Sequence, residues 1–219
     1  MDSSGNIILG ASTAAAGTVA VSNIETIQTE MMGIRIVAAS TVIASTILAL
    51  TGVKQATFFI DHARGSTVNF AGTGTNYLIQ ASEKAAGNDT WRTLAIFSAD
   101  SAACSSALSS GAIAPAATTI VILSGTAFVA NDLVFVADTT AATASEWMRV
   151  ISVTGTASFK ILDGITNAHA DTEVLYNKAE NFVVTVDCSA LTRTRVVVNN
   201  NASATNQPIY SRVAIITAK

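Results

Sequence analysis

Two histidines are the first residues to consider for general-base or metal-binding chemistry. His62 stands in the segment IDHARG beside Asp61, and His169 stands in TNAHAD close to Asp171. A metal site needs several ligands at defined spacing, and a catalytic dyad needs a nucleophile within reach. Neither histidine has such neighbours in the sequence. Both are therefore predicted to be exposed or turn-stabilising residues.

Acidic and glycine-rich segments give no stronger signal. Asp163, Asp171 and Glu173 lie in DGITNAHADTE, but their spacing departs from the alternating oxygen ligands of a calcium loop. Residues 72–74 (GTG) lack the following Lys-Ser/Thr of a phosphate loop and the third glycine of a dinucleotide fold. We predict a β-turn at residues 72–74 and no catalytic residue, cofactor-binding residue or metal ligand in the chain.

Each tryptophan is followed by an arginine within two residues, Trp91 by Arg92 and Trp147 by Arg149. Both tryptophans are predicted to lie in strands and to pack half-buried, whereas an exposed one would mark an interface.

Three further arginines stand in segments that alternate between apolar and polar residues: Arg193, Arg195 and Arg212. We predict that they share one solvated face. They are either ordinary surface residues or contacts to an acidic patch of a neighbouring subunit.

Composition restricts the class of function. Of the 219 residues, 50% are hydrophobic and only 12% are charged, with a net charge of −3. The low charge suits either a packed β domain with a Ser/Thr/Asn surface or a protein whose surface is covered by partners. No basic cluster is available to neutralise phosphates, so no nucleic-acid partner is predicted.

The sequence predicts neither a secretion signal nor a membrane partner. Asp2 stands where a signal peptide has positive charge. Residues 36–53 form a long uncharged run, but it is rich in Val, Ile, Thr and Ser, which favour strands over a membrane helix.

Strand patterns cover most of the chain after residue 33. The clearest block is 51–100, with predicted strands at 55–61, 77–82 and 91–97, and long alternating strands return at 182–186, 194–198 and 210–217. Between them lie short strands separated by polar turns, at 119–123, 133–137, 147–153, 158–162 and 172–176.

We therefore predict an all-β fold, an antiparallel, jelly-roll-like β-sandwich interrupted by a small β-barrel. Residues 34–103 and 179–219 form the sandwich, residues 104–178 form the inserted barrel, and residues 1–33 form an extended arm. Residues 138–145 (DTTAATAS) are predicted to be an exposed loop tip. Cys104 and Cys188 flank the insertion and are expected to approach each other as free buried thiols or as a bonded pair.

Three stretches resemble virion structural proteins of tailed bacteriophages. They are residues 52–97 (GVKQATFFIDHARG to WRTLAIF), residues 131–169 (NDLVFVAD to ILDGITNAH) and residues 192–219 (TRTRVVVNNN to SRVAIITAK). The resemblance implies a multi-copy virion component but assigns no functional residues.

The expected function is therefore non-enzymatic. The chain is predicted to decorate or cement a phage capsid through contacts with copies of itself, the major capsid protein or other virion proteins. It would form a homo-oligomer in the virion after assembly in the host cytoplasm. Alternatives are a tail, neck or baseplate ring component, or a filament-forming β protein joined by arm or strand exchange.

Overall fold

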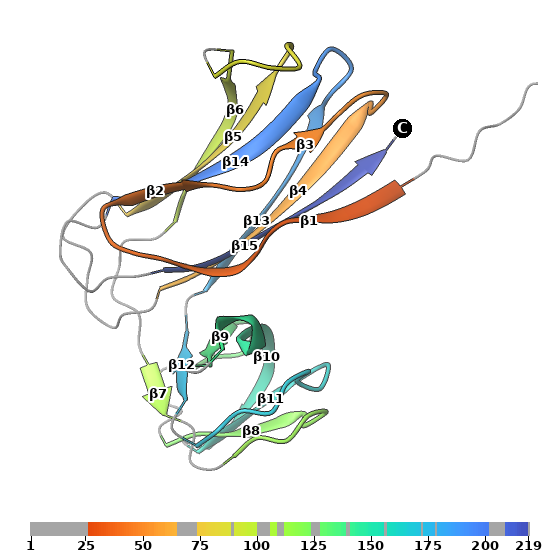
Figure 1. Ribbon diagram of the computed structural model, residues 1–219. Coiled ribbons are helices and arrows are strands. Elements are labelled where there is room, and N and C mark those ends of the chain that lie inside the picture. The colour runs from red at the N-terminus through yellow and green to blue at the C-terminus, as the bar shows by residue number, and fades with distance from the viewer. Residues whose placement is uncertain are drawn as a thin grey trace, which may run out of the picture.

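The structure of the chain is a computed structural model with strands arranged in three antiparallel sheets (Figure 1). It describes residues 26–64, 74–88, 90–99, 106–108, 112–123, 128–138, 141–155, 157–171, 173–177, 179–201 and 209–218. Their one helical element is a short 3-10 turn, η1 (Ala142–Ala144). No helix in these residues is long and apolar enough to cross a membrane.

Two of the sheets pack face to face as a sandwich. The first sheet has the order β1 (Thr26–Val37), β15 (Ile209–Ala218), β4 (Gln55–Arg64) and β13 (Glu180–Asp187). The second sheet has the order β2 (Thr41–Ala44), β14 (Arg193–Asn200), β5 (Thr75–Ser82) and β6 (Arg92–Ala99), with β3 (Leu48–Ala49) also paired to β14.

The sheet order is that of a jelly roll. When β2 and β3 are counted as one, the sandwich strands follow the chain as β1, β2–β3, β4, β5, β6, β13, β14 and β15. The first sheet then reads first, eighth, third, sixth, and the second reads second, seventh, fourth, fifth. These are the two interlocked Greek keys of a double-sheet jelly roll. The predicted all-β, jelly-roll-like sandwich is confirmed.

Alternating side chains build the sandwich core. In β4 the inward residues Ala56, Phe58 and Ile60 have no exposed surface, because successive strand residues point to opposite faces of a sheet. They pack with inward residues of the facing sheet such as Tyr77 and Val196. Residues 36–53 contribute the end of β1 and the strands β2 and β3, as predicted.

The third sheet is made only from residues between β6 and β13. Its order is β7 (Ser106–Leu108), β12 (Val174–Tyr176), β9 (Leu133–Ala137), β10 (Glu146–Thr154), β11 (Ser158–Ile161) and β8 (Thr119–Val121). It has a core of its own, which includes Ile120, Val134 and Phe159. Among the described residues no ladder joins the end strands β7 and β8, so closure into a barrel stays a prediction.

The N-terminal boundary differs from the predicted one. β1 begins at Thr26 and pairs with β15 from Thr26↔Ala218 onward, so residues 26–33 belong to the sandwich and not to an arm. The cause is the partner strand, since β15 offers a free edge along its full length. Residues 1–25 lie outside the described part of the chain.

A small aromatic cluster joins the third sheet to the sandwich. Phe135 of β9 has no exposed surface, and its ring centroid lies 4.6 Å from that of Trp147 and 4.6 Å from that of Tyr210 on β15. Ala63 of β4 completes the contact, and the Trp147 indole N–H donates to the His62 carbonyl at 3.4 Å. We call Phe135, Trp147, Tyr210 and Ala63 the junction cluster. Trp147 is half-buried, as predicted, because it packs between the third sheet and the sandwich.

Replacing Phe135 with Ala should loosen this docking. Replacing a buried Phe with Ala lowers the free energy of unfolding by about 3–5 kcal/mol. Here the lost contacts are those between the third sheet and the sandwich, and the separate cores of the two units are unchanged. We expect one calorimetric unfolding transition to split into two or to move to lower temperature. V129A, at a residue 60% exposed in the same unit, should change stability by less than about 0.5 kcal/mol. An unchanged transition in F135A would contradict the proposed coupling.

Candidate functional site

Both histidines are buried, so the prediction that each is exposed or turn-stabilising is wrong for His62 and holds for His169 only in its second form. His62 is 1% exposed and lies in β4 with its Nδ1 2.8 Å from the Tyr77 hydroxyl. β4 runs through His62 to Arg64 because β13 pairs with it as far as His62 and β15 pairs with it as far as Arg64. His169 is 2% exposed and does stabilise the turn in which it was predicted to lie.

His169 bridges two carboxylates in the third sheet. Its Nε2 lies 2.8 Å from Glu146 Oε1, and its Nδ1 lies 2.5 Å from Glu173 Oε2. Glu146 also accepts the backbone N–H groups of Thr166 (2.9 Å) and Asn167 (3.0 Å). The cluster of Glu146, His169 and Glu173 thus fixes the segment after β11 against the start of β10.

The protonation states follow from these contacts. Burial alone would lower the pKa of His169, but the hydrogen bonds to Glu146 and Glu173 outweigh it and raise that pKa above 6.5. Burial would raise the pKa of Glu146, yet the bonds from His169, Thr166 and Asn167 lower it below 4.5. All the hydrogen-bonding sites of the imidazole are used, so His169 acts as a structural ion and not as a free base.

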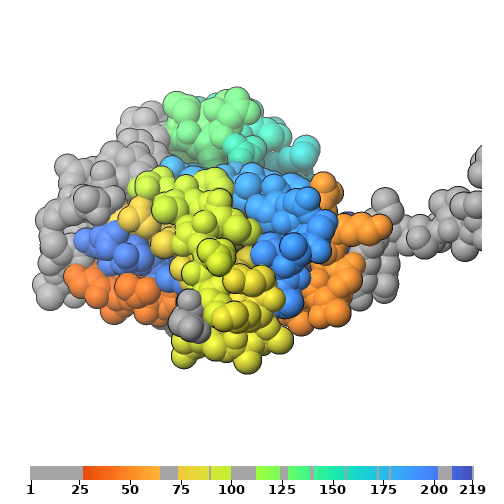
Figure 2. Space-filling model, turned by 90° about the horizontal axis from the view of Figure 1, so that it is seen from above, coloured from red at the N-terminus to blue at the C-terminus, as the bar shows by residue number. Residues whose placement is uncertain are grey.

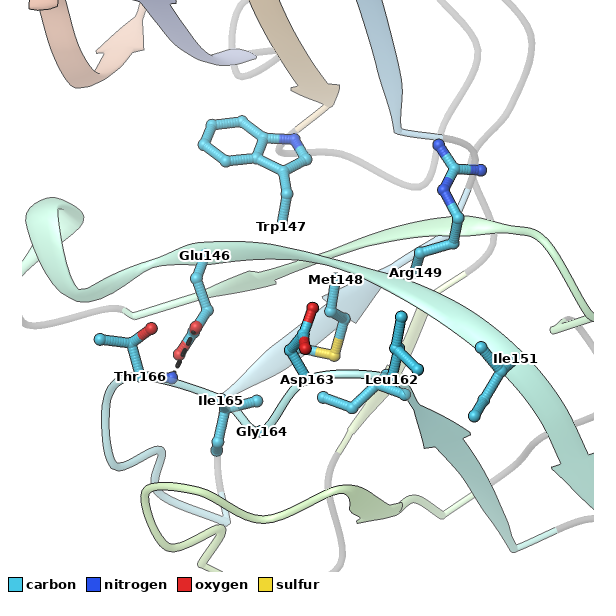
Figure 3. A pocket seen from close by; sticks show the side chains of 11 residues that line it. Glu146, Trp147, Met148, Arg149, Ile151, Leu162, Asp163, Gly164, Ile165 and Thr166 are labelled. Carbon is cyan, nitrogen blue, oxygen red and sulfur yellow. Dashed lines mark hydrogen bonds between the residues drawn. The ribbon is translucent and has the colours of Figure 1, made fainter.

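A recess of about 330 Å³ lies beside this cluster, between β10 and residues 162–166 (Figure 3). Glu146 and Met148 point to one side of β10, whereas Trp147 and Arg149 point to the other. Gly164 is required there, because a Cβ would lie 2.6 Å from the backbone of Ala116. The recess has a mixed lining, with apolar side chains such as Met148 and Ile165 beside the polar Asp163 and Thr166, and the Glu146 carboxylate at its end is already hydrogen-bonded.

The remaining candidates for metal or thiol chemistry are separated. Asp163 and Asp171 are exposed, and Glu173 is bound to His169. Among the described residues, no group of three or more His, Cys, Asp or Glu side chains could hold a metal ion. Cys188 is buried and free, and burial, followed by the charge of Asp187, raises its thiol pKa to about 11. Cys104 lies outside the described part of the chain, so the predicted approach of the two cysteines stays a prediction. Residues 72–73 also lie outside it, so the β-turn predicted at residues 72–74 stays a prediction as well.

In the segment predicted to be an exposed loop tip, residues 138–145, Ala141 and Thr143 are exposed as predicted, but both ends are tied down. Asp138 and Ser145 are buried, and the Asp138 backbone N–H donates to the Ser145 hydroxyl at 2.9 Å. η1 within this segment lies against β1 of the sandwich. The packing of the third sheet on the sandwich, which the local sequence does not encode, buries these ends.

The predicted single arginine face is wrong. Arg212 lies on β15 in the first sheet, where it binds Glu30 at 3.0 Å and lies 4.0 Å from Asp61. Arg193 and Arg195 lie on β14 in the second sheet. Arg212 is therefore ion-paired on the outer face of the first sheet, whereas Arg193 and Arg195 form no ion pair among the described residues of the second sheet.

Four aliphatic residues face one another across the outer side of the second sheet. Val197 of β14 pairs with Ala44 of β2 and with Leu78 of β5, and Leu78 pairs with Ile96 of β6. We call Ala44, Val197, Leu78 and Ile96 the outer row. Ile96 is 61% exposed. Alternation in each strand indicated outward positions, but only the register between strands aligns them.

The outer row is extended by two more exposed aliphatic side chains. Val42 of β2 is 61% exposed and Leu94 of β6 is 41% exposed. Leu94 stands at a register shift between β5 and β6, which is typical of a protected sheet edge. An exposed apolar stripe that crosses a whole sheet is typical of a contact surface.

At the end of the sandwich remote from the third sheet, the turn after β5 and the start of β14 lie side by side (Figure 2). Here the guanidinium carbons of Arg193 and Arg195 lie 4.5 and 4.2 Å from the Trp91 ring centroid. The predicted half-burial of Trp91 is confirmed. Trp91 directly precedes β6 and does not lie in the strand as predicted, and its stacking on two arginines was not foreseen. Arg193 and Arg195 are separated in sequence from Trp91, so no local pattern joins them.

The charge state of the carboxylate–histidine cluster predicts a pH-dependent effect of H169Q. Wild-type stabilisation by His169 is complete below pH 6.5 and is lost as pH rises through its raised pKa. Stabilisation by Glu146 is complete above pH 4.5 and is lost as pH falls through its lowered pKa. H169Q should therefore lose most stability near pH 5.5, by about 3–5 kcal/mol, and less above the folded pKa of His169.

Urea unfolding of wild type and H169Q between pH 5 and 9 measures this difference. D163N is the matched control, because Asp163 is an exposed carboxyl group in the same segment. D163N should change the free energy of unfolding by less than about 0.5 kcal/mol at every pH. A wild-type-minus-H169Q difference that stays constant with pH would contradict a charged His169.

Comparison of the chain with protein-family models and with curated proteins finds no match. No activity, substrate or partner therefore comes to this chain from a relative. The sheet topology and the chemistry of the described surfaces are the physical basis for proposing a function.

Proposed function

We propose that the chain is a non-enzymatic virion structural protein that decorates or cements the capsid of a tailed bacteriophage. The observation that carries the proposal is the jelly-roll order of the two sandwich sheets. This architecture recurs in viral capsid domains, although lectins and cupins share it. Fold alone does not fix function, so the resemblance to phage virion proteins is a second, independent support.

The surface chemistry favours contacts with other proteins. Only 12% of the residues are charged, and the outer row presents aliphatic side chains across the second sheet. Many equivalent contacts of this kind suit a symmetric homo-oligomer on a shell. The partners are other copies of the chain and the major capsid protein or another virion protein, and the location is the virion after assembly in the host cytoplasm.

A cementing role has a simple thermodynamic form. A protein that binds across neighbouring subunits adds its binding free energy to the assembled shell and not to the separated subunits. The inserted third sheet enlarges the area over which such contacts form, and the junction cluster holds it to the sandwich.

A filament or ring built by strand exchange is the second candidate. β1 is an edge strand of the first sheet and begins directly after residues 1–25. A segment preceding an edge strand is well placed to add to a neighbour's sheet. A tail, neck or baseplate position would use the same contacts at one vertex of the particle.

Particle rupture and immunogold labelling test the proposal. Particles assembled without the chain should release DNA at a lower temperature than complete particles, and adding purified protein should restore the difference. Labels should cover the head. Labels confined to one vertex, together with unchanged rupture, would favour the tail or neck position. Polymerisation of the purified protein that is abolished by deleting residues 1–25 would favour the filament.

A further inference from the structure

We propose that the outer face of the second sheet binds an acidic protein segment, in which aliphatic side chains cover the outer row and a carboxylate engages Arg195 beside Trp91. This inference rests on the proposed function only in taking the partner to be another virion protein. Its chemistry follows from the charges and contacts of the face itself.

The positive charge of the two arginines beside Trp91 is not balanced by a carboxylate among the described residues. Arg193 is 9% exposed and donates to the Gly87 carbonyl and, at 3.3 Å, to the Thr90 hydroxyl. Arg195 donates through Nε to Gln80 Oε1 at 2.9 Å. Among the described residues neither arginine forms an ion pair, so two cations share one indole ring without a counterion.

Arg195 keeps hydrogen-bond donors that a ligand could use. Its Nε is occupied, and its two terminal nitrogens have no partner among the described residues. Burial and then the neighbouring charge of Arg193 lower the pKa of Arg195, yet guanidinium groups stay protonated in proteins. A carboxylate bound there would neutralise the pair of charges and accept charge-assisted hydrogen bonds.

The chemistry of this face suits a protein partner better than a nucleic acid. Nucleic-acid binding needs several cations to track the phosphates. The nearest other arginine of this sheet, Arg92, pairs in register with the inward-facing Ala81, and its guanidinium is already bound to Glu83 at 3.2 Å. The outer row next to the arginines is aliphatic. Aromatic, arginine and aliphatic side chains together are the composition of protein–protein hot spots.

The opposite face of the sandwich supplies the contrast. There Arg212 is neutralised by Glu30 and Asp61, and Thr57 is hydrogen-bonded to Thr185 at 2.8 Å. On the first sheet the outward arginine thus has carboxylate partners, whereas on the second sheet Arg195 has none and lies beside the outer row. This unpaired cation next to aliphatic side chains favours the second sheet as the docking face.

Matched variants test the two parts of the surface separately. R195Q removes the cation, and R212Q removes an arginine that is already ion-paired on the other sheet. I96N breaks the outer row, and V183N makes the same kind of change on the first sheet, where Val183 is 55% exposed. Circular dichroism and the thermal midpoint of each variant establish that it is folded.

The probe is a synthetic 12-residue peptide of alternating Val and Glu, titrated by isothermal calorimetry at constant ionic strength. Polyglutamate and a single-stranded oligothymidylate serve as comparison probes. We expect R195Q to weaken peptide binding by about tenfold, and I96N to weaken peptide binding but not polyglutamate binding. R212Q and V183N should bind the peptide as wild type does.

Four results would overturn the inference. They are tighter binding of the oligonucleotide than of the peptide, equal loss of peptide binding in R195Q and R212Q, no binding of the peptide, and loss of a homo-oligomer in R195Q by analytical ultracentrifugation. The last result would make a second copy the occupant.

The immunogold experiment keeps this inference separable from the proposed function. If the chain is absent from particles but binds the peptide through Arg195, the virion role is refuted and the docking surface stands. If the R195Q variant cements particles as well as wild type does, the docking surface is refuted and the cementing role stands.

Discussion

The pairing of β4 with β13 and β15 is the constraint on which the sandwich depends. β4 lies between these two strands in the first sheet, and all three bury one side of each strand against the second sheet. Both partners come from the far end of the chain. The sandwich is therefore complete only when the chain has returned from the third sheet, and contacts of such long sequence separation close slowly in folding.

This constraint also explains how the third sheet is held. The chain leaves the sandwich after β6 and re-enters at β13, so the inserted unit is attached at two points. The junction cluster around Phe135 adds a packed contact between those points. Inside the inserted unit, the buried charges of Glu146, His169 and Glu173 are mutually paired and also hydrogen-bonded to backbone, which is the condition under which buried ions are tolerated.

The two outer faces of the sandwich have different chemistry although both come from alternating strands. On the first sheet, the outward Arg212 finds carboxylate partners within the sheet. On the second sheet, the register aligns aliphatic residues, and two arginines stack on Trp91 without an acid. This difference matters for binding because the chain has few charged residues, so few other charged side chains are available to attract a partner elsewhere. The asymmetry supports a protein that presents one face to a neighbour.

The sequence by itself determined most of the strands, the all-β class and the interruption of the sandwich, because period-2 alternation and turn residues are local properties. It missed the first part of β1, which becomes a strand only through its pairing with β15. Residues 55–61 and 194–198 were found for this reason. Only the tertiary structure decided the burial of His62, the ion cluster of His169, the separation of Arg212 from Arg195 and the alignment of Ala44 with Ile96. These depend on register and on which strand lies beside which, and pairing between distant segments leaves no trace in the spacing of either segment alone.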